Sequence, residues 1–338
     1  MIIESLMLIL GLALLVWGSD KFVESGSVIA KKLGISDFII GLTLIAVGTS
    51  LPELAATLIA ALKGSSGLVV GNLVGSNIAN IGLVVGICAI FYVIRTHETM
   101  LKRDGYIMLF ISIIFVLLAM NGAVNYIEGM VLLIVYFIYI LFLIESKEII
   151  KKKFHFREFV DYSIRFEFIG TLLNFSKSSS IKEKANRDGL VKDFIISAIS
   201  LAALIYGARL LVYKSIYFSR MLGVSETFTG LALIAVGTSL PELAVSISAV
   251  RKGFNEILIG NIIGSNIANI SLVFGITSFI APVQIAASSI YYLIPAMLIF
   301  SVLFLALIRK EGNINRKHGA ILLTIYALFL LFAGFRKL

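Results

Sequence analysis

The chain of 338 residues is poor in cysteine and histidine, and each shortage excludes a class of site. Cys88 is the one cysteine, so neither a disulfide nor a thiolate metal site can form within a single chain. The three histidines fall at the ends of apolar segments or in loops, which argues against a transition-metal site. No nucleophile is paired with a base, so we do not expect an enzyme, and no motif indicates a bound cofactor.

Charge is also scarce: charged residues make up 14% of the chain, whereas hydrophobic residues make up 59%. Long apolar runs recur from end to end, and about 20 apolar residues in a helix can cross a bilayer. Because a spanning segment must satisfy its own backbone hydrogen bonds, we predict an all-α polytopic membrane protein. The first residues lack the basic region and cleavage site of a signal peptide, so we expect the first segment to be retained. Ten transmembrane helices are expected, at residues 3–33, 38–62, 67–94, 104–120, 127–145, 191–222, 228–251, 256–280, 286–308 and 317–335.

The net charge of +9 comes from cations that gather on one side of this arrangement. With the N-terminus outside, 22 of the 29 Lys and Arg residues fall in inner connections. The outer connections hold only Lys63, Arg220, Arg336 and Lys337. This bias follows the positive-inside rule rather than the pattern of a nucleic-acid-binding protein. We therefore predict a multi-pass protein of the plasma membrane, in contact with lipid, with both termini outside.

Residues 146–190 form the one long polar stretch, and they separate a first part, 1–145, from a second part, 191–338. The charge bias predicts that this loop is cytoplasmic. At about 45 residues it is too short for an independent domain, so we interpret it as a solvated connector. The alternative is an amphipathic helix that lies on an anionic lipid surface.

Two sequence motifs occur twice, each time 189 positions apart. Residues 41–55 read GLTLIAVGTSLPELA, and residues 230–244 read GLALIAVGTSLPELA. Residues 71–81 read GNLVGSNIANI, and residues 260–270 read GNIIGSNIANI. Five predicted helices precede the loop and five follow it, so the second copy enters the membrane from the opposite side. The sequence thus predicts two inverted-topology repeats with broken helices at the centre.

The first motif places a carboxylate, Glu53, inside an apolar segment, where a charge is costly unless a cation or a proton neutralises it. Pro52 lacks an N–H group and clashes with the carbonyl one turn earlier, so we expect the helix to open near Gly48–Thr49. Oxygen donors then gather on one face: the carbonyls of Ala46, Val47 and Thr49 and the hydroxyls of Thr49 and Ser50. The second copy repeats this set with Ala235, Val236, Thr238, Ser239, Pro241 and Glu242. Such hard oxygen ligands suit Ca²⁺.

The second motif adds neutral oxygens. Asn72, Ser76 and Asn80 share one helix face, and their equivalents are Asn261, Ser265 and Asn269. Glycines four residues apart, at 71 and 75 and at 260 and 264, permit close approach of another helix. The two glutamates supply a charge of −2, which neutralises one Ca²⁺ or two Na⁺. Helix packing alone would explain one small-residue motif, but not the duplication of both.

These motif pairs resemble the α-repeats of the cation/Ca²⁺ exchanger superfamily, specifically its prokaryotic-type Na⁺/Ca²⁺ exchangers, over essentially the whole chain. By this resemblance, Glu53 and Glu242 are the central ligands of Ca²⁺, together with the carbonyls of Thr49 and Thr238. The resemblance also implies Na⁺ positions lined by Ser50, Ser76, Ser239, Ser265 and the carbonyls of Ala46 and Ala235, with Asn80 and Asn269 at the centre. Some relatives, including K⁺-dependent exchangers, have an aspartate at the position of Asn269. The asparagine in this chain therefore argues against K⁺ dependence.

The family also moves its first and sixth helices, here 3–33 and 191–222, across a rigid core. Asp20 and Arg209 occupy equivalent positions in these two helices, and we consider them as a gating ion pair. We expect a monomeric antiporter that exchanges Na⁺ for Ca²⁺ by alternating access. The alternative is a Ca²⁺/H⁺ antiporter on the same scaffold, since a glutamate in the membrane can also carry a proton. A channel is less favoured, because the ligands form one compact cage rather than rings along a pore.

Overall fold

The computed structural model describes residues 2–32, 48, 50–95, 101–148, 156–178, 189–251, 253 and 255–336, which are almost entirely helical. The first part contains α1 (Ile2–Lys32), α4 (Leu51–Leu62), α5 (Ser66–Ala79), α6 (Gly86–Phe91), α8 (Tyr106–Ala119) and α9 (Tyr126–Glu148). The loop contains α10 (Phe156–Ile164) and α11 (Glu167–Ser178). The second part contains α12 (Leu190–Leu222), α13 (Glu226–Thr229), α14 (Ala235–Thr238), α15 (Leu240–Arg251), α16 (Asn255–Ile267), α17 (Phe274–Ile280), α18 (Ile294–Glu311) and α19 (Arg316–Phe335). Short π-helical segments join some of them: η2 (Asn80–Val85), η3 (Leu101–Gly105), η4 (Gly230–Ile234), η5 (Ala268–Val273) and η6 (Ser289–Leu293).

Seven helices in the described residues are long and apolar enough to cross a membrane, and a bent pair, Glu226–Thr238 with Leu240–Arg251, makes an eighth. These eight coincide with eight of the ten predicted segments. The two others are not counted as spans. Only Leu51–Leu62 of predicted segment 38–62 is described as a helix, and α8, in segment 104–120, has 14 residues.

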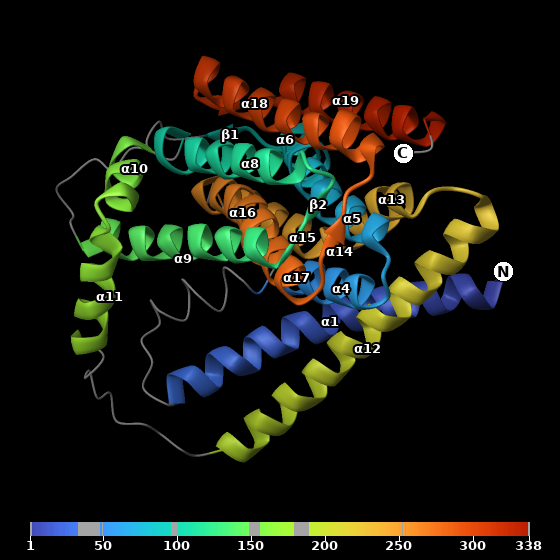
Figure 1. Cartoon of the computed structure of the whole chain (residues 1–338), viewed down its shortest axis with the longest axis horizontal. Helices are drawn as coiled ribbons and strands as arrows, with labels where there is room; N and C mark the ends of the chain where they lie inside the picture. The colour runs from blue at the N-terminus through green and yellow to red at the C-terminus, as the bar shows by residue number, and fades with distance from the viewer. Residues whose placement is uncertain are drawn as a thin grey trace.

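Helices α1 and α12 cross each other as an antiparallel pair beside the other helices (Figure 1). The crossing is close, because a Cβ atom on Gly18 would lie 2.6 Å from the backbone nitrogen of Leu204. Ion pairs join the two helices at both ends: Lys32 with Asp193 at 2.6 Å, and Lys214 with Glu4. The hypothesis of an ion pair between Asp20 and Arg209 is wrong. Both side chains are exposed, and the register of the crossing puts them at different levels.

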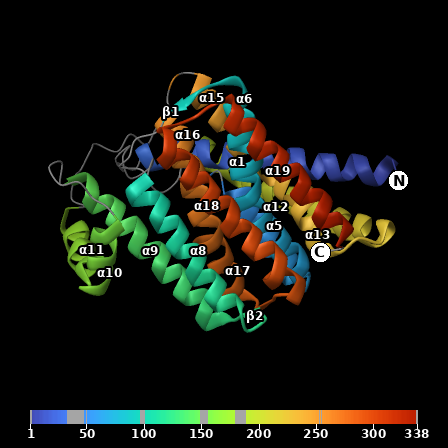
Figure 2. The ribbon, with the colours of Figure 1, turned by 90° about the horizontal axis from the view of Figure 1, so that it is seen from above.

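The remaining helices of the two parts interleave (Figure 2). Helix α6 packs against α19, and α17 packs against α9. Two short antiparallel strand pairs also join the two parts. Strand β1 (Ile94–Arg95) pairs with β4 (Asn313–Ile314), and β2 (Ala123–Val124) pairs with β3 (Val283–Gln284). Neither part could therefore keep its helix contacts without the other.

The loop is more than the solvated connector that we expected. Phe159 and Tyr162 of α10 are buried, and both rings pack at a steep angle against the ring of Phe142 in α9. The hydroxyl of Tyr162 donates to Thr171 at 2.9 Å, and Thr171 donates to the Glu145 carboxylate at 2.5 Å. The connector interpretation was wrong for α10 and α11, because their aromatic residues supply an apolar face that packs onto the helix ends.

The ends of the molecule are distinct in Figure 1. Both chain termini and the turn from α12 to α13 lie at one end, and α10 and α11 lie at the opposite end. The helices of the loop and the chain termini are therefore at opposite ends of the molecule.

Candidate cation-binding site

The two copies of the first motif have the same backbone conformation where the helix breaks. Ser50 precedes α4 with φ −88° and ψ 4°, and Ser239 precedes α15 with φ −82° and ψ 4°. This is the sparsely populated bridge region, where active-site residues are frequent. The segments before and after Ser239 make an angle of 42°. The break predicted from the proline therefore exists, one or two residues later than expected.

The carbonyl groups near the break differ from the prediction. Pro241 has no N–H group, so the carbonyl of Gly237 loses its helical partner. The Ala235 carbonyl keeps its own, because the Ser239 N–H donates to it at 3.0 Å. The prediction of a freed Ala235 carbonyl was wrong, since the helix continues one residue further. In the first copy, Ala46, Val47 and Thr49 lie outside the described residues.

Glu53 and Glu242 are both fully buried and close enough for their charges to interact. The Ser265 hydroxyl donates to Glu242 Oε1 at 3.4 Å. The hydroxyls of Ser76 and Thr238 are near the Glu53 carboxylate. No residue in the described ranges, however, makes a hydrogen bond to either oxygen of Glu53. A carboxylate buried in this way needs a cation or a proton.

Four asparagines form a crossed network between the two copies of the second motif. Asn77 donates to the Asn266 carbonyl at 3.2 Å, and Asn266 donates to the Asn77 carbonyl at 3.4 Å. Asn80 donates to Asn266 Oδ1 at 3.0 Å, and Asn269 donates to Asn77 Oδ1 at 3.1 Å. The amide nitrogens of Asn80 and Asn269 are thereby engaged, which leaves their oxygens as acceptors.

The result is a concentration of buried oxygen atoms that accept no hydrogen bond from the described residues. They are Ser50 Oγ, both carboxylate oxygens of Glu53, Ser76 Oγ, Asn80 Oδ1, Ser239 Oγ and Asn269 Oδ1. An uncompensated buried polar atom costs about 1–3 kcal/mol. A hard cation that takes oxygen ligands would compensate several of them at once, so this donor set fits Ca²⁺ or Na⁺.

A second layer of hydrogen bonds joins the first asparagine of the second motif to the helix after the break in each half, and one of these bonds also links the two halves. Asn72 donates to Thr57 at 2.8 Å and accepts from the Thr238 hydroxyl at 3.2 Å. In the other half, Asn261 donates to Ser246 at 3.3 Å and to the Glu242 carbonyl at 3.4 Å. Thr57 and Ser246 are 189 positions apart, like the motifs themselves.

Sequence reasoning missed Asn77 and Asn266, although both lie within the duplicated motif. They fall outside the four-residue spacing that relates Asn72, Ser76 and Asn80, and that spacing alone gave them no role. Their identity in both copies was the available signal. Sequence reasoning also missed Thr57 and Ser246. These two residues differ in type and lie outside the nearly identical copies of the first motif.

Helix α1 lies against both helix breaks. Pro52 removes the helical partner of the Gly48 carbonyl, and the Ser19 hydroxyl donates to that carbonyl at 3.1 Å. A Cβ atom on Gly48 would lie 2.5 Å from Val23, and one on Gly237 would lie 2.9 Å from Leu12. The two motif glycines thus allow α1 to pass directly over the site.

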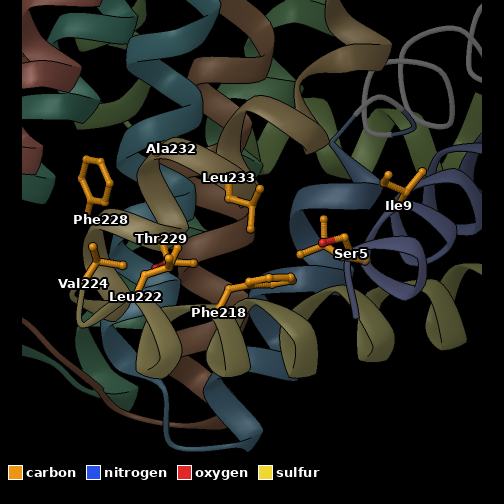
Figure 3. Close-up of a pocket in the computed structure, with 10 residues that line it drawn as sticks. Ser5, Ile9, Phe218, Leu222, Val224, Phe228, Thr229, Ala232 and Leu233 are labelled. Carbon is orange, nitrogen blue, oxygen red and sulfur yellow. The ribbon is translucent and has the colours of Figure 1, made fainter. Parts of the chain in front are cut away.

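An apolar cavity of about 420 Å³ separates α1 and α12 from the segment that leads to the second break. Its walls come from α1, α12, α13 and η4, and Figure 3 shows Phe218 extending from α12 toward Ser5 of α1. The contact between the helix pair and the core is therefore loose at this point.

Comparison with known proteins gives consistent matches over nearly the whole chain. The model of the sodium/calcium exchanger protein family matches residues 4–145 and 192–335. The chain is 42% identical to the sodium/calcium exchanger MaX1 of Methanosarcina acetivorans, with 97% of each chain covered. It is 32% identical to the inner membrane protein YrbG of Escherichia coli, with 96% of this chain and 94% of that one covered. A solved structure of the sodium-calcium exchanger NCX_Mj, soaked with 10 mM Na⁺ and zero Ca²⁺, has a TM-score of 0.61 and 29% identity over 98% of both chains.

Proposed function

This chain belongs to the sodium/calcium exchanger protein family, and we propose that it exchanges Na⁺ for Ca²⁺ across a membrane by alternating access. The observation that supports this best is the pair of fully buried carboxylates, Glu53 and Glu242, beside oxygens that have no internal donor. Both ions would compete for the same charge of −2. The protein then changes the side to which the site is open only when bound cations neutralise the two carboxylates. This requirement couples the flux of Na⁺ to the flux of Ca²⁺.

We assign roles within the site as follows. Glu53 and Glu242 bind Ca²⁺, with the carbonyls of Thr49 and Thr238. The Na⁺ positions are lined by Ser50, Ser76, Ser239, Ser265 and the carbonyls of Ala46 and Ala235, with Asn80 and Asn269 at the centre. The Ala235 carbonyl can serve although it already accepts one hydrogen bond, since a carbonyl oxygen has two lone pairs. Asn77 and Asn266 orient the central pair without binding the ion.

The proposed architecture has ten transmembrane helices in two inverted five-helix repeats, 1–145 and 191–338, joined by a cytoplasmic loop at 146–190. The crossed asparagines and the exchanged strand pairs support the two-fold relation, because each contact has a counterpart near the 189 offset. We place both termini outside the plasma membrane, with the chain in contact with lipid and active as a monomer. The α1/α12 pair moves over the site to change access. Its contacts at both helix breaks and the loose apolar cavity support that movement.

The test is Na⁺-driven Ca²⁺ uptake into proteoliposomes. Vesicles loaded with Na⁺ are diluted into Na⁺-free buffer, and labelled Ca²⁺ is followed with and without a pH gradient. We expect uptake that depends on the Na⁺ gradient. Uptake driven by the pH gradient alone, indifferent to Na⁺, would instead identify a Ca²⁺/H⁺ antiporter.

Two variants test the site in the same assay. Glu53→Gln and Glu242→Gln each remove one of the two charges, so uptake should fall to the level of empty vesicles. Glu226→Gln is the matched control, because Glu226 begins α13 and is only partly buried. Wild-type uptake by either site variant would refute the assignment.

A further inference from the structure

A second cavity, with two positively charged residues in its lining, lies on a different face of α12 from the apolar one. Its volume is about 590 Å³. The turn between α4 and α5 contributes Lys63 and Ser65. Helix α12 contributes Tyr213, Ile216, Tyr217, Arg220 and Met221. Two cations from separate elements, Lys63 and Arg220, therefore line the same cavity.

Neither cation has a carboxylate partner in the part of the chain that the structure describes. The Lys63 ammonium group lies over the Tyr213 ring, 4.5 Å from its centroid, and this contact leaves the charge uncompensated. Glu226 approaches the same region, but it packs its Cβ atom beside Gly67 and does not line the cavity. The cavity thus carries net positive charge.

The charge bias of the chain makes this pair unusual. At the 189 offset, Lys63 corresponds to Lys252 and Arg220 corresponds to Lys31. The positive-inside rule is sufficient reason for Lys31 and Lys252, on the predicted inner face. It gives no reason for Lys63 and Arg220, which are on the outer face. The outer pair therefore needs another explanation.

The position of the cavity indicates what it binds. Its lining residues come from the α4–α5 turn and the last third of α12. These segments lie toward the end that carries the chain termini and the α12–α13 turn (Figure 1), where the proposed orientation places the membrane–water interface. Tyr213 and Tyr217 are half-exposed there, as tyrosines commonly are at that depth. Ile216 and Met221 supply apolar surface beside the cations. A matching ligand has an anionic group next to an apolar body.

We propose that this cavity binds the headgroup of an anionic phospholipid, with the phosphate between Lys63 and Arg220. Arginine and lysine bind phosphate through charge-assisted hydrogen bonds, and the apolar residues contact the start of the acyl chains. The site joins α12 to the end of α4, the helix that carries Glu53. The proposal rests on the membrane orientation of the proposed function, but not on ion exchange itself.

Native mass spectrometry of the detergent-solubilised full chain, titrated with phosphatidylglycerol, tests the proposal. We expect one tightly retained lipid. Lys63→Gln and Arg220→Gln should each weaken its binding by about fivefold, and the double variant by about thirtyfold, because one interfacial cation contributes about 1 kcal/mol. Arg336→Gln is the matched control and should bind normally. Arg336 is another of the predicted outer cations, but it lies over the Tyr292 ring, outside the cavity.

Two further probes separate the possible ligands. Phosphatidylcholine should not compete, and retention equal to that of phosphatidylglycerol would overturn the requirement for an anionic lipid. Inorganic phosphate that binds as tightly as the lipid would identify a free-anion site and refute the lipid assignment. Equal weakening by Arg336→Gln would refute the location. Ca²⁺ uptake by the same wild-type preparation is measured separately, so a failure of exchange and a failure of lipid binding are distinguishable.

Discussion

Replacing Asn77 by alanine tests whether the crossed asparagine network sets the geometry of the ion site. The substitution removes the hydrogen bond to the Asn266 carbonyl at 3.2 Å and a weaker contact to the Met297 sulfur at 3.7 Å. It also removes the acceptor of the Asn269 amide, at 3.1 Å. All of these groups are buried, so the lost partners cannot be replaced by bulk water.

The expected magnitude follows from these contacts. Side-chain hydrogen bonds between membrane helices contribute about 0.6–1.7 kcal/mol each. Two such bonds, together with a small cavity, give a destabilisation of about 2–4 kcal/mol. The Asn269 side chain also loses the contact that fixes its amide. Because the proposed site places this oxygen at its centre, the Ca²⁺ affinity should fall by roughly tenfold, which corresponds to about 1.4 kcal/mol.

Thermal unfolding of the solubilised protein and calorimetric titration with Ca²⁺ measure both effects. Ser112→Ala is the matched control, because Ser112 is equally buried but donates only to Met108 of its own helix. It should lower the melting temperature slightly and leave Ca²⁺ affinity unchanged. If Asn77→Ala behaves like this control in both measurements, the network does not organise the site.

Two other predictions concern packing and the loop. Gly71→Ala should abolish a monodisperse peak in size-exclusion chromatography, because its Cβ atom would lie 2.1 Å from the Thr227 carbonyl oxygen, whereas Gly170→Ala, in open surroundings, should elute normally. Tyr162→Phe should destabilise α10 and α11 by about 1 kcal/mol, since it removes the hydrogen bond to Thr171. Burial raises the pKa of Tyr162 to about 12 from its ordinary 10, so the neutral hydroxyl stabilises the fold fully below pH 10, and that contribution is lost as the pH rises to 12. The difference in melting temperature between wild type and variant should shrink over that range, and a constant difference would contradict the assignment.

Much of the candidate site could be predicted from sequence because its chemistry is local. A glutamate one residue after a proline, in an apolar segment, predicts both a costly charge and a broken helix without reference to any neighbour. The structure places Glu53, Ser50, Ser239 and Glu242 at such breaks. The exact residue of the break was missed, because the Ser239 N–H group still finds the Ala235 carbonyl.

The loop shows why other features could not be predicted. Its sequence has enough charge to suggest a solvated connector, and α10 is apolar on one face only. The structure of α10 depends on two rings of neighbouring helices, because Phe159 packs against Phe110 of α8 and Phe142 of α9. Nothing within residues 146–190 specifies where those rings lie.

The sequence by itself determined that this is a membrane protein with a duplicated oxygen-rich motif, because apolar length and near-identical repetition are properties of the chain alone. Only the tertiary structure decided which side chains keep their oxygens available. Whether Asn80 and Asn269 offer an oxygen depends on what engages their nitrogens, and that is Asn266 and Asn77, from the opposite copy of the motif. Such a partner is 186 or 192 residues away in the chain, so packing between the two halves, rather than local sequence, fixes the acceptors.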